Sequence, residues 1–464
     1  MIPVASRSSQ HIAVFGLGAS GRATAHALTA GGATVTAWDD NAESRIDAAN
    51  ENIPLADLTK SDWSGFSALI LSPGVPLTHP TPHPVVDCAR NAGQLIIGDI
   101  ELLTENRGGA VLIGITGTNG KSTTSALIHH VLQRTGCSVQ IGGNFGPPVL
   151  GLAPPVPQGE IVLELSSYQL DLTQNATFDI AVLLNVTPDH LDRHGDMAGY
   201  VAAKERIFRA ATGPHRQIAV IGIDDEYGQT IHRQLSGNDA WRVIPISTTR
   251  VLDEGVFVID GKLHDADGTT GRNTCDISDF ETLRGRHNWQ NAAAAWAVAR
   301  ARDVAPEEIA KALRSYAGLP HRLETIAEID GIRYVNDSKA TNGEAVARAL
   351  ASFSTIYWIA GGVAKEDGLG PAEPYLDRVR GAFLIGGAAD EFESTLTGKV
   401  PVTRSGDLAT AITDARKCAR TENLPAPVVL LSPACASFDQ YPNFAARGDH
   451  FRDLVNALGR EGAE

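Results

Sequence analysis

The segment 116–123, with the sequence Thr-Gly-Thr-Asn-Gly-Lys-Ser-Thr, carries the strongest chemical signal in the chain. An apolar run at 111–115 precedes it and an apolar stretch follows at 125–132, so the order predicts a strand, a loop and a helix. Glycines let backbone N–H groups close around phosphate oxygens, lysine adds a positive charge, and the serine hydroxyl suits Mg²⁺. We therefore predict a nucleoside triphosphate site.

This loop is a variant of the common phosphate-loop pattern. The spacing G-x-x-x-x-G-K-[ST] would place a glycine at position 115, where the chain has Ile115. A glycine-rich turn with a surface lysine is the alternative interpretation. Gly-Lys-Ser at the start of a predicted helix favours phosphate chemistry over that alternative.

Two more polar residues stand at the ends of apolar runs. Glu164 lies within the run 161–165, and His190 follows the run 180–185. A buried carboxylate needs a partner, which is either Mg²⁺ on the triphosphate or a structural arginine. A lone histidine is more often structural, but beside a phosphate loop it is a candidate ligand or substrate contact.

Lys204, Asn288 and Asn291 give weaker signals. Within the segment 202–208, Lys204 has the pattern of an ordinary lysine on a helix surface. Asn288 and Asn291 are three residues apart on one side of a predicted helix, a spacing that is also typical of solvated side chains. The pattern alone favours a surface position for all three.

Near the N-terminus, the spacing Gly16-x-Gly18-x-x-Gly21 follows the first predicted strand, and Asp39 closes the second. This is the arrangement of a dinucleotide fingerprint, with a simple tight turn as the alternative. A second glycine turn, 71–75, also follows a predicted strand. Two glycine turns at one sheet edge favour a nucleotide-like ligand.

The last third of the chain places basic residues beside turns, in the segments 321–322, 336–342 and 361–365. In an acidic protein this pattern indicates anion recognition. The segment 431–440 ends a predicted strand with small residues that let backbone amides approach a ligand. Within it, Cys435 has no activating histidine pattern, and a packed small residue is the favoured interpretation over a nucleophile.

Short apolar runs that alternate with polar or alanine-rich segments predict an α/β fold with parallel sheets. The 464 residues exceed what one core usually supports. We predict three domains: a Rossmann-like domain at 1–104, a central ATPase domain of the phosphate-loop type at 105–318, and an α/β Rossmann-like domain at 319–464. The strands expected within them are 12–15, 34–38, 68–71, 94–97, 111–115, 161–165, 180–185, 218–221, 334–336, 356–360, 381–385 and 428–432.

The composition narrows the class of protein. With 54 acidic and 39 basic residues, the net charge of −15 opposes binding to nucleic acid. Five scattered cysteines without metal-type spacing are typical of a reducing compartment. Neither an N-terminal signal core nor an apolar run long enough to cross a bilayer is present. We expect a cytoplasmic protein without membrane insertion, and a monomer.

Taken together, these segments resemble the Mur ligases over nearly the whole chain. The resemblance is carried by 116–123, 164–167, 189–190, 285–288 with Asn291, 319–322, 336–342 and 431–440. It implies an ATP- and Mg²⁺-dependent ligase that adds an amino acid to the uridine-nucleotide precursor of peptidoglycan, a process that supports cell shape and division. Within the family, the pattern is most similar to the member that joins D-glutamate to UDP-N-acetylmuramoyl-L-alanine.

The resemblance also implies roles for individual residues. Lys121, His190, Lys204 and Lys339 would be catalytic. Mg²⁺ would be held by Ser122, Glu164, His190 and Lys204, the last as a carbamate, against the surface position that its pattern alone favours. The residues that would bind ATP are Gly117, Thr118, Asn119, Gly120, Lys121, Ser122, Thr123, Asn288, Asn291, Arg322 and Asp337. Those that would bind the other substrates are Ala19, Ser20, Asp39, Asp40, Gly74, Asn144, Thr341, Lys365, Ser437 and Phe444.

One position departs from the family pattern. Asn41 stands where some relatives are expected to have an arginine, so a charged contact to the uridine ligand would be missing. Three alternatives stay open from the sequence: a Mur-type ligase with a different amino acid or acting on folate, an NAD-dependent oxidoreductase built on the first glycine loop, and a nucleotide-binding regulator without catalysis.

Overall fold

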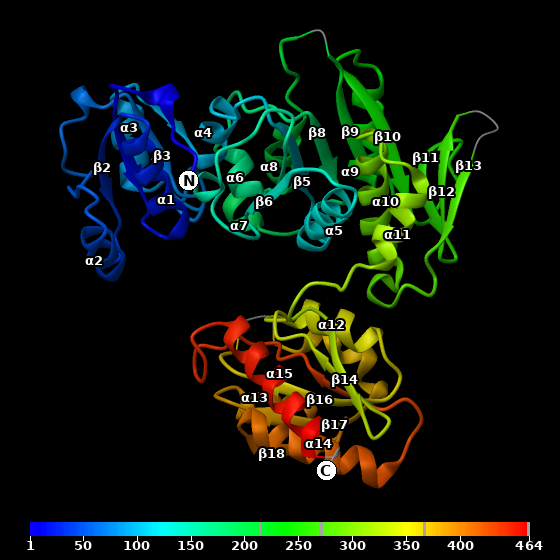
Figure 1. The fold of residues 1–464 in the computed structure, drawn as a ribbon. Helices are drawn as coiled ribbons and strands as arrows, with labels where there is room; N and C mark the ends of the chain where they lie inside the picture. The colour runs from blue at the N-terminus through cyan, green and yellow to red at the C-terminus, as the bar shows by residue number, and fades with distance from the viewer. Residues whose placement is uncertain (214, 269–271, 365–367, 462–464) are drawn as a thin grey trace. The chain divides into compact units, whose positions relative to one another are not determined.

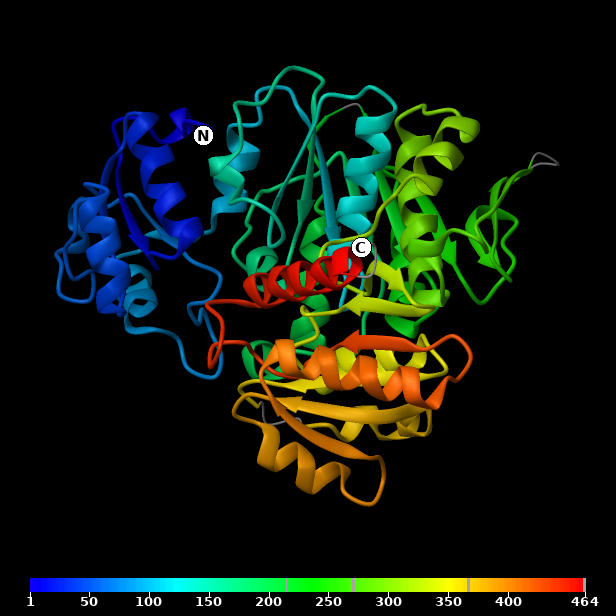
Figure 2. The ribbon, with the colours of Figure 1, turned by 60° about the horizontal axis from the view of Figure 1, so that its bottom comes forward.

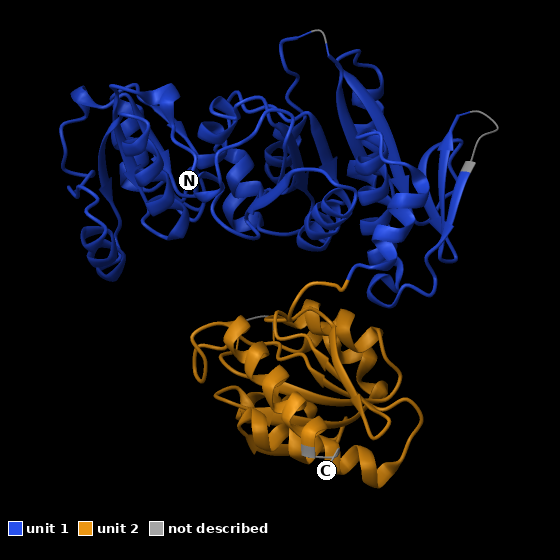
Figure 3. Ribbon diagram, viewed as in Figure 1, with its two compact units in different colours: residues 1–316 blue, residues 317–464 orange. Residues whose placement is uncertain are grey.

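The structure, a computed structural model, describes all residues except 214, 269–271, 365–367 and 462–464. Lys365, a predicted substrate contact, therefore lies outside the described residues. The chain forms two compact units, residues 1–316 and 317–464 (Figure 3). The described residues form three sheets with helices between the strands, which confirms the predicted α/β class (Figure 1). The division into three domains stays a prediction.

The first sheet is parallel, with the strand order β2-β1-β3-β4. β2 and β3 lie on opposite sides of β1, so the order of the strands reverses at this point. Because β1 and β3 are parallel neighbours, the two glycine turns that follow them lie side by side. The hydroxyl of Ser72 donates to the carbonyl oxygen of Gly16 at 2.9 Å. Its elements are β1 (His11–Phe15), β2 (Thr34–Trp38), β3 (Ala68–Leu71), β4 (Leu95–Ile97), η1 (Ala5–Arg7), α1 (Ala19–Ala30), α2 (Ala42–Asn50), η2 (Trp63–Gly65), α3 (Pro84–Asn91) and α4 (Asp99–Glu105).

The second sheet has the order β13-β12-β11-β10-β9-β8-β5-β7-β6 and is parallel from β6 to β11. β5 lies between β7 and β8, so the segments that follow these three strands meet at one edge. The strands are β5 (Val111–Thr116), β6 (Val139–Gly143), β7 (Glu160–Glu164), β8 (Ile180–Leu183), β9 (Gln217–Gly222), β10 (Trp241–Ser247), β11 (Glu254–Ile259), β12 (Lys262–Asp267) and β13 (Arg272–Asp276).

The helices of this second part cover both faces of its sheet. α10 packs along α5 and against β9 to β11. The helices are α5 (Lys121–Arg134), η3 (Val149–Gly151), α6 (Ser167–Asp171), α7 (Leu191–His194), α8 (Met197–Glu205), η4 (Arg206–Phe208), α9 (Glu226–Ser236), η5 (Glu281–Leu283), α10 (Arg286–Ala301) and α11 (Pro306–Arg314).

The third sheet, in the unit 317–464, has the order β14-β15-β19-β16-β17-β18, with only β14 antiparallel to its neighbour. Two helices, α14 and α15, cover one face, orange and red in Figure 2, while α12, η6 and α13 cover the other. The elements are β14 (Glu324–Ile329), β15 (Ile332–Asn336), β16 (Ile356–Gly361), β17 (Val379–Ile385), β18 (Val402–Gly406), β19 (Val428–Leu431), α12 (Gly343–Ala351), η6 (Gly370–Arg378), α13 (Ala389–Leu396), α14 (Leu408–Glu422) and α15 (Phe444–Glu461).

The central strands of the third sheet carry apolar side chains on both faces of the sheet. In β16, Trp358 points into the core under α12 and α13, whereas Tyr357 and Ile359 point into the core under α14 and α15. A strand buried on both faces needs a continuous apolar run, because successive side chains point to opposite sides. The predicted runs 356–360 and 381–385 fall within β16 and β17, and the run 428–432 extends one residue beyond the end of β19.

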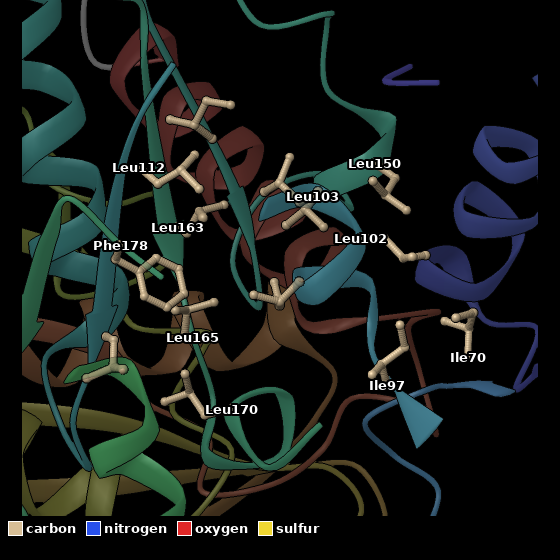
Figure 4. Close-up of a cluster of buried hydrophobic side chains, with 14 of the residues drawn as sticks. Ile70, Ile97, Leu102, Leu103, Leu112, Leu150, Leu163, Leu165, Leu170 and Phe178 are labelled. Atoms are coloured by element: carbon tan, nitrogen blue, oxygen red, sulfur yellow. The ribbon is translucent and has the colours of Figure 1, made fainter. Parts of the chain in front are cut away.

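One large core joins the first two sheets and accounts for the single unit 1–316. Figure 4 shows Leu102 and Leu103 of α4 between Ile70 of the first sheet and Leu163 of the second. Hydrogen bonds also connect the two sheets, since the side-chain carboxylate of Glu101 accepts from three successive backbone amides at 174–176. The first two sheets are therefore packed together through α4 and η3.

Candidate active site

The phosphate loop connects β5 to α5 at the edge where β7 and β8 also end. Gly117 and Gly120 have φ angles of 152° and 86°, which favour glycine. A Cβ atom on Gly120 would clash with Oδ1 of Asn291. The Lys121 ammonium donates to the carbonyl oxygens of Gly117, at 2.8 Å, and Thr118, at 2.9 Å. The lysine is thus folded onto the loop that it is predicted to serve.

Asn185, which the sequence analysis did not single out, holds the shape of this loop. Its carbonyl oxygen accepts from the amide of Thr118 at 2.9 Å, and its Oδ1 accepts from the amide of Asn119 at 2.9 Å. Its Nδ2 donates to the carbonyl oxygen of Asn119 and to Gln290. The signal was present, because Asn185 follows β8 at the same sheet edge as the other candidates.

Lys204, in α8, is buried with 1% of its surface exposed, so the surface position favoured by pattern alone is wrong. Its Nζ donates to the carbonyl oxygen of Gly117 at 2.9 Å and lies 4.5 Å from the centre of the Tyr200 ring. Burial, followed by the positive charge of Lys121, lowers the pKa of Lys204 from 10.5 to about 7. Two lysines thus share one carbonyl oxygen, and one of them is partly neutral near pH 7.

Glu164 ends β7 opposite Ile115 of β5 and is 2% exposed. Its Oε1 accepts from Nδ2 of Asn144 at 2.8 Å, and its backbone carbonyl accepts from the amide of Asn144 at 2.9 Å. Its Oε2 is buried and has no hydrogen-bond partner among the described residues. The partner is thus an asparagine, and the arginine alternative is wrong. A buried carboxylate oxygen without a donor fits a bound cation.

His190 begins the short turn α7 with a left-handed φ of 53°. Its ring lies 5.0 Å from the Tyr168 ring, and its Nε2 is 3.5 Å from Oδ2 of Asp189. The nearby His194 is buried against Ser167, and this burial lowers the pKa of His194. His190 is the more exposed of the two, as expected for a ligand contact.

Asn291 and Asn288 both lie in α10, close to the start of α5. Asn291 is 2% exposed, so a solvated position is wrong for it. Its Oδ1 accepts from the hydroxyl of Thr124 at 3.0 Å, and its Nδ2 donates to Asn288 at 3.2 Å. In α5, Ser122 is half-buried and Thr123 is buried. Asn291 therefore fixes α10 against the helix that begins at the phosphate loop.

At the edge of the first sheet, Asp39 uses both carboxylate oxygens on backbone amides, those of Leu17 at 2.6 Å and Asn41 at 2.8 Å. It therefore shapes the glycine loop. Ala19 and Ser20 begin α1, and Ser20 donates to the buried Asp99. Outside the loop, Asp40 pairs with His83, and Gly74 is exposed.

The departure at Asn41 has a structural reason. Its side chain caps α2 by accepting from the amides of Glu43 and Ser44. Arg45, one turn into the same helix, donates to the carbonyl oxygens of residues 39 and 40 and lies 4.6 Å from the Trp38 ring. A guanidinium group therefore does lie at this end of β2, although it comes from position 45 and not from position 41.

In the unit 317–464, Asp337, Lys339 and Thr341 follow β15, and Ser437 follows β19. Asp337 accepts from Ser432 at 2.8 Å, and burial raises the pKa of Asp337 from 3.8 to about 7, against the opposing charge of Arg322. The ammonium of Lys339 lies 5.5 Å from the ring of Phe444, the first residue of α15. These residues therefore gather at one end of the sheet.

Arg447 is a residue of this end that the sequence did not reveal. It is 1% exposed and donates to Ser338 and to the carbonyl oxygen of Cys435, while its Nη1 has no partner among the described residues. The hydroxyl of the buried Ser437 is likewise without a partner there. Cys435 is buried in the apolar core, in agreement with the packing interpretation.

Comparison with known proteins decides the family. Residues 115–299 match the Mur ligase middle domain. A UDP-N-acetylmuramoylalanine–D-glutamate ligase of Rhodospirillum rubrum is 48% identical over 463 residues, covering 99% of this chain and 97% of the relative. The chain belongs to the Mur ligase family. A relative of the same name from Nitrobacter hamburgensis is also 48% identical, over 462 residues and 98% of its length.

Solved structures of Mur ligases share the fold. The UDP-N-acetylmuramate–alanine ligase of Thermotoga maritima has a TM-score of 0.56 at 16% identity, covering 97% of this chain and all of the other. A UDP-N-acetylmuramoyl-L-alanyl-D-glutamate–2,6-diaminopimelate ligase gives 0.56 at 17% identity, over 99% of this chain and 94% of the other. Membership in this family favours a ligase over an oxidoreductase or a regulator. No helix in the described part of the chain has the length and apolar character needed to cross a bilayer.

Proposed function

We propose that this Mur ligase uses ATP to join the carboxyl group of UDP-N-acetylmuramoyl-L-alanine to the amino group of D-glutamate, in the cytoplasmic assembly of a peptidoglycan precursor. The observation that carries the reaction class is the convergence of Lys121 and Lys204 on one loop carbonyl, beside the strand that ends in Glu164. The choice of substrates is supported by the names of the relatives from Rhodospirillum and Nitrobacter.

The proposed reaction has two steps. A carboxylate resists attack by an amine, since it is negatively charged and has no good leaving group. One carboxylate oxygen therefore attacks the γ-phosphorus of ATP, ADP leaves, and an acyl phosphate forms. The amine nitrogen of D-glutamate then attacks the carbonyl carbon. The tetrahedral intermediate collapses as the bond to phosphate breaks, and the nitrogen loses a proton.

The phosphate loop is proposed to bind the triphosphate. Its glycines let the backbone amides face the phosphates, and Lys121 would turn from the loop carbonyls to the β- and γ-phosphates. The remaining ATP contacts, carried over from the family pattern, are Asn288, Asn291, Arg322 and Asp337. Asn291 would act mainly by holding the start of α5, because its side chain is already bonded to Thr124 and Asn288.

Mg²⁺ would stabilise the negative charge that develops on the transferred phosphoryl group. Glu164 fits such a cation through its buried Oε2, and Ser122, His190 and a carbamylated Lys204 are the other proposed ligands. The described residues contain no group of three or more His, Cys, Asp or Glu that would form an all-protein metal site. This agrees with Mg²⁺, which usually binds through one or two carboxylates and the substrate phosphates.

Lys204 is proposed to act as a carbamate. A lysine with a pKa of about 7 is partly a neutral amine, which is the form that attacks carbon dioxide. The nitrogen forms a bond to the carbon of CO₂ and loses a proton, so the cation becomes an anion. This change would also remove the repulsion between Lys204 and Lys121.

The other substrates are assigned to the remaining candidates. Ala19, Ser20, Asp39, Asp40 and Gly74 are proposed to contact the uridine nucleotide, and Asn144 the muramoyl part. Lys339 and Thr341 are assigned to the reacting end of the substrate. Ser437 and Phe444, with Lys365 outside the described residues, are assigned to D-glutamate.

Phosphate release and amide formation test the proposal. The purified chain is incubated with ATP, Mg²⁺ and UDP-N-acetylmuramoyl-L-alanine across a panel of L- and D-amino acids. We expect phosphate release and an amide product with D-glutamate, and neither with Lys121→Met. A product with another amino acid would assign the chain to a different Mur reaction, and phosphate release without any amide would contradict ligase activity.

A further inference from the structure

Arg193, three residues after His190, binds a loop of the first sheet. Its Nη1 donates to the carbonyl oxygen of Gly74 at 2.9 Å, and its Nη2 donates to those of Pro73 at 3.2 Å and Val75 at 3.1 Å. One guanidinium thus satisfies three successive carbonyl groups in the second glycine turn. A planar group with several fixed donors can do this, whereas a single ammonium group cannot match the same geometry.

The same arginine is tied to the predicted metal contact. Its backbone amide donates to the carbonyl oxygen of His190 at 3.1 Å. Its guanidinium also lies 4.5 Å from the centre of the Tyr168 ring, and that ring is 5.0 Å from the ring of His190. Arg193 is therefore linked to His190 in two ways: its backbone bonds to the backbone of His190, and its side chain packs on the Tyr168 ring that lies beside the His190 ring.

A second contact joins the two segments at the same place. Gly195, which ends the α7 turn with a φ of 82°, packs against the ring of His79. A Cβ atom on Gly195 would be 3.0 Å from Nε2 of that histidine. The segment 73–79 of the first sheet and the turn 190–195 of the second are therefore in close contact within the unit 1–316.

We propose that Arg193 is a positioning residue that aligns the second glycine turn, 71–75, which is proposed to contact the uridine nucleotide, with the turn 190–195. With its carbonyl groups held by Arg193, the glycine turn is fixed as a nucleotide contact, and the same bonds hold His190 where Mg²⁺ and the triphosphate are proposed to bind. Binding of the uridine substrate and binding of magnesium-ATP then strengthen each other. The inference rests on the proposed function, because the proposed function assigns the uridine nucleotide to one turn and magnesium-ATP to the other.

The test uses three variants of the full chain. Arg193→Met removes the donors, and Arg193→Lys keeps a charge but loses the fork. The matched control is Arg216→Met, because Arg216 also donates to two backbone carbonyl groups, those of Asp239 and Trp241, but lies in a different part of unit 1–316. Calorimetry measures the dissociation constant of UDP-N-acetylmuramoyl-L-alanine with and without magnesium-ADP, and kinetics gives the KM of each substrate and kcat.

We expect Arg193→Met to raise the KM for the uridine substrate about tenfold and to abolish the effect of magnesium-ADP on its dissociation constant. Arg193→Lys should recover part of both, and Arg216→Met should keep both at the wild-type values. Because coupling of two ligands is compared within one variant, a simple loss of stability does not produce this result.

Two outcomes would overturn the inference in different ways. If Arg193→Met binds both ligands with wild-type coupling, the arginine is only a structural link between the two segments, even if the melting temperature falls. If the wild-type chain itself binds no uridine substrate, the proposed function fails and the role of Arg193 fails with it.

Discussion

At the residue scale, the unusual feature is a pair of lysines on one backbone carbonyl. Lys121 and Lys204 come from different helices, and both donate to Gly117. Only the first was identifiable from its local pattern, because a glycine-rich turn precedes it. Burial of Lys204 depends on how α8 packs against a loop that lies 87 residues away, and local spacing does not encode that contact.

The lowered pKa of Lys204 predicts a specific dependence of stability on pH. Between about pH 7 and pH 10.5 the unfolded chain binds a proton at this lysine that the folded chain lacks. Lys204 therefore makes the folded state more stable as the pH rises through this window. In carbon dioxide-free buffer, Lys204→Met should flatten the rise in unfolding free energy measured with urea. The exposed Lys262→Met is the control, and an unchanged slope in Lys204→Met would contradict the lowered pKa.

Removal of the proposed carbamate should be reversible by a small anion. Lys204→Ala leaves a cavity beside the phosphate loop and removes the anionic ligand, so we expect a fall in kcat of roughly a hundredfold or more. Added acetate or formate, which can enter that cavity, should restore part of the activity. Initial rates over a range of carboxylate concentrations measure the rescue. Full activity of the variant without any carboxylate would remove this role.

At the element scale, the sequence predicted most of the central parallel strands but missed the parallel strands β6, β10, β11 and β18 and the antiparallel strands β12, β13 and β14. Strands buried on both faces have continuous apolar runs, and 34–38 and 68–71 match β2 and β3 to the residue. β12 and β13 were missed because their apolar residues are few, whereas β11 was missed although residues 256–259 are all apolar. A signal was nevertheless present, since Asp260 and Gly261 join β11 to β12 with positive φ angles, as a two-residue hairpin requires.

The start of α5 provides an element-scale prediction. Gly120 and Gly136 stand at the two ends of this helix with similar left-handed φ angles, 86° and 89°. A Cβ atom would meet Asn291 at Gly120 and no atom within 4 Å at Gly136. Both alanine variants should lose about 1–2 kcal/mol of stability from backbone strain. Only Gly120→Ala should also raise the KM for ATP, and equal values for the two variants would contradict a role of the Gly120–Asn291 contact in shaping the loop.

Several site residues can be identified only from the tertiary structure. Asn185 reaches a loop 66 residues away, and Arg447 reaches Ser338 across 109 residues. Glu164 was found because it is an acid within an apolar run, and His190 because it follows such a run; both signals can be read from local sequence. Residues that act by packing against a distant segment need the tertiary structure, since neither periodicity nor a turn signal marks them.

At the scale of the whole molecule, the first two sheets form one unit although the sequence separates them. The apolar runs show where each sheet begins. They do not show that α4 and η3 fill the space between the sheets with a shared core. The composition of α4, with Leu102 and Leu103, is that of any amphipathic helix, so only its packing reveals the connection.

The shared core predicts cooperative unfolding of residues 1–316. Leu102 is fully buried, and Leu102→Ala should cost about 2–5 kcal/mol. Hydrogen exchange should then become faster in both β1 and β5 and stay unchanged in β16 of the other unit. The control is Leu430→Ala, which changes a buried leucine of the third sheet. Among the three probed strands β1, β5 and β16, it should speed exchange only in β16. Faster exchange restricted to the first sheet would show that the two sheets unfold separately.

The central claim is that ATP bound over Lys121 transfers its γ-phosphoryl group to the carboxylate of UDP-N-acetylmuramoyl-L-alanine. Labelling that carboxylate with oxygen-18 tests it most directly, because an acyl phosphate passes one carboxylate oxygen to the released phosphate. With D-glutamate and ATP present, mass spectrometry should find one labelled oxygen in the phosphate for each amide formed. Amide formation with unlabelled phosphate would contradict the account.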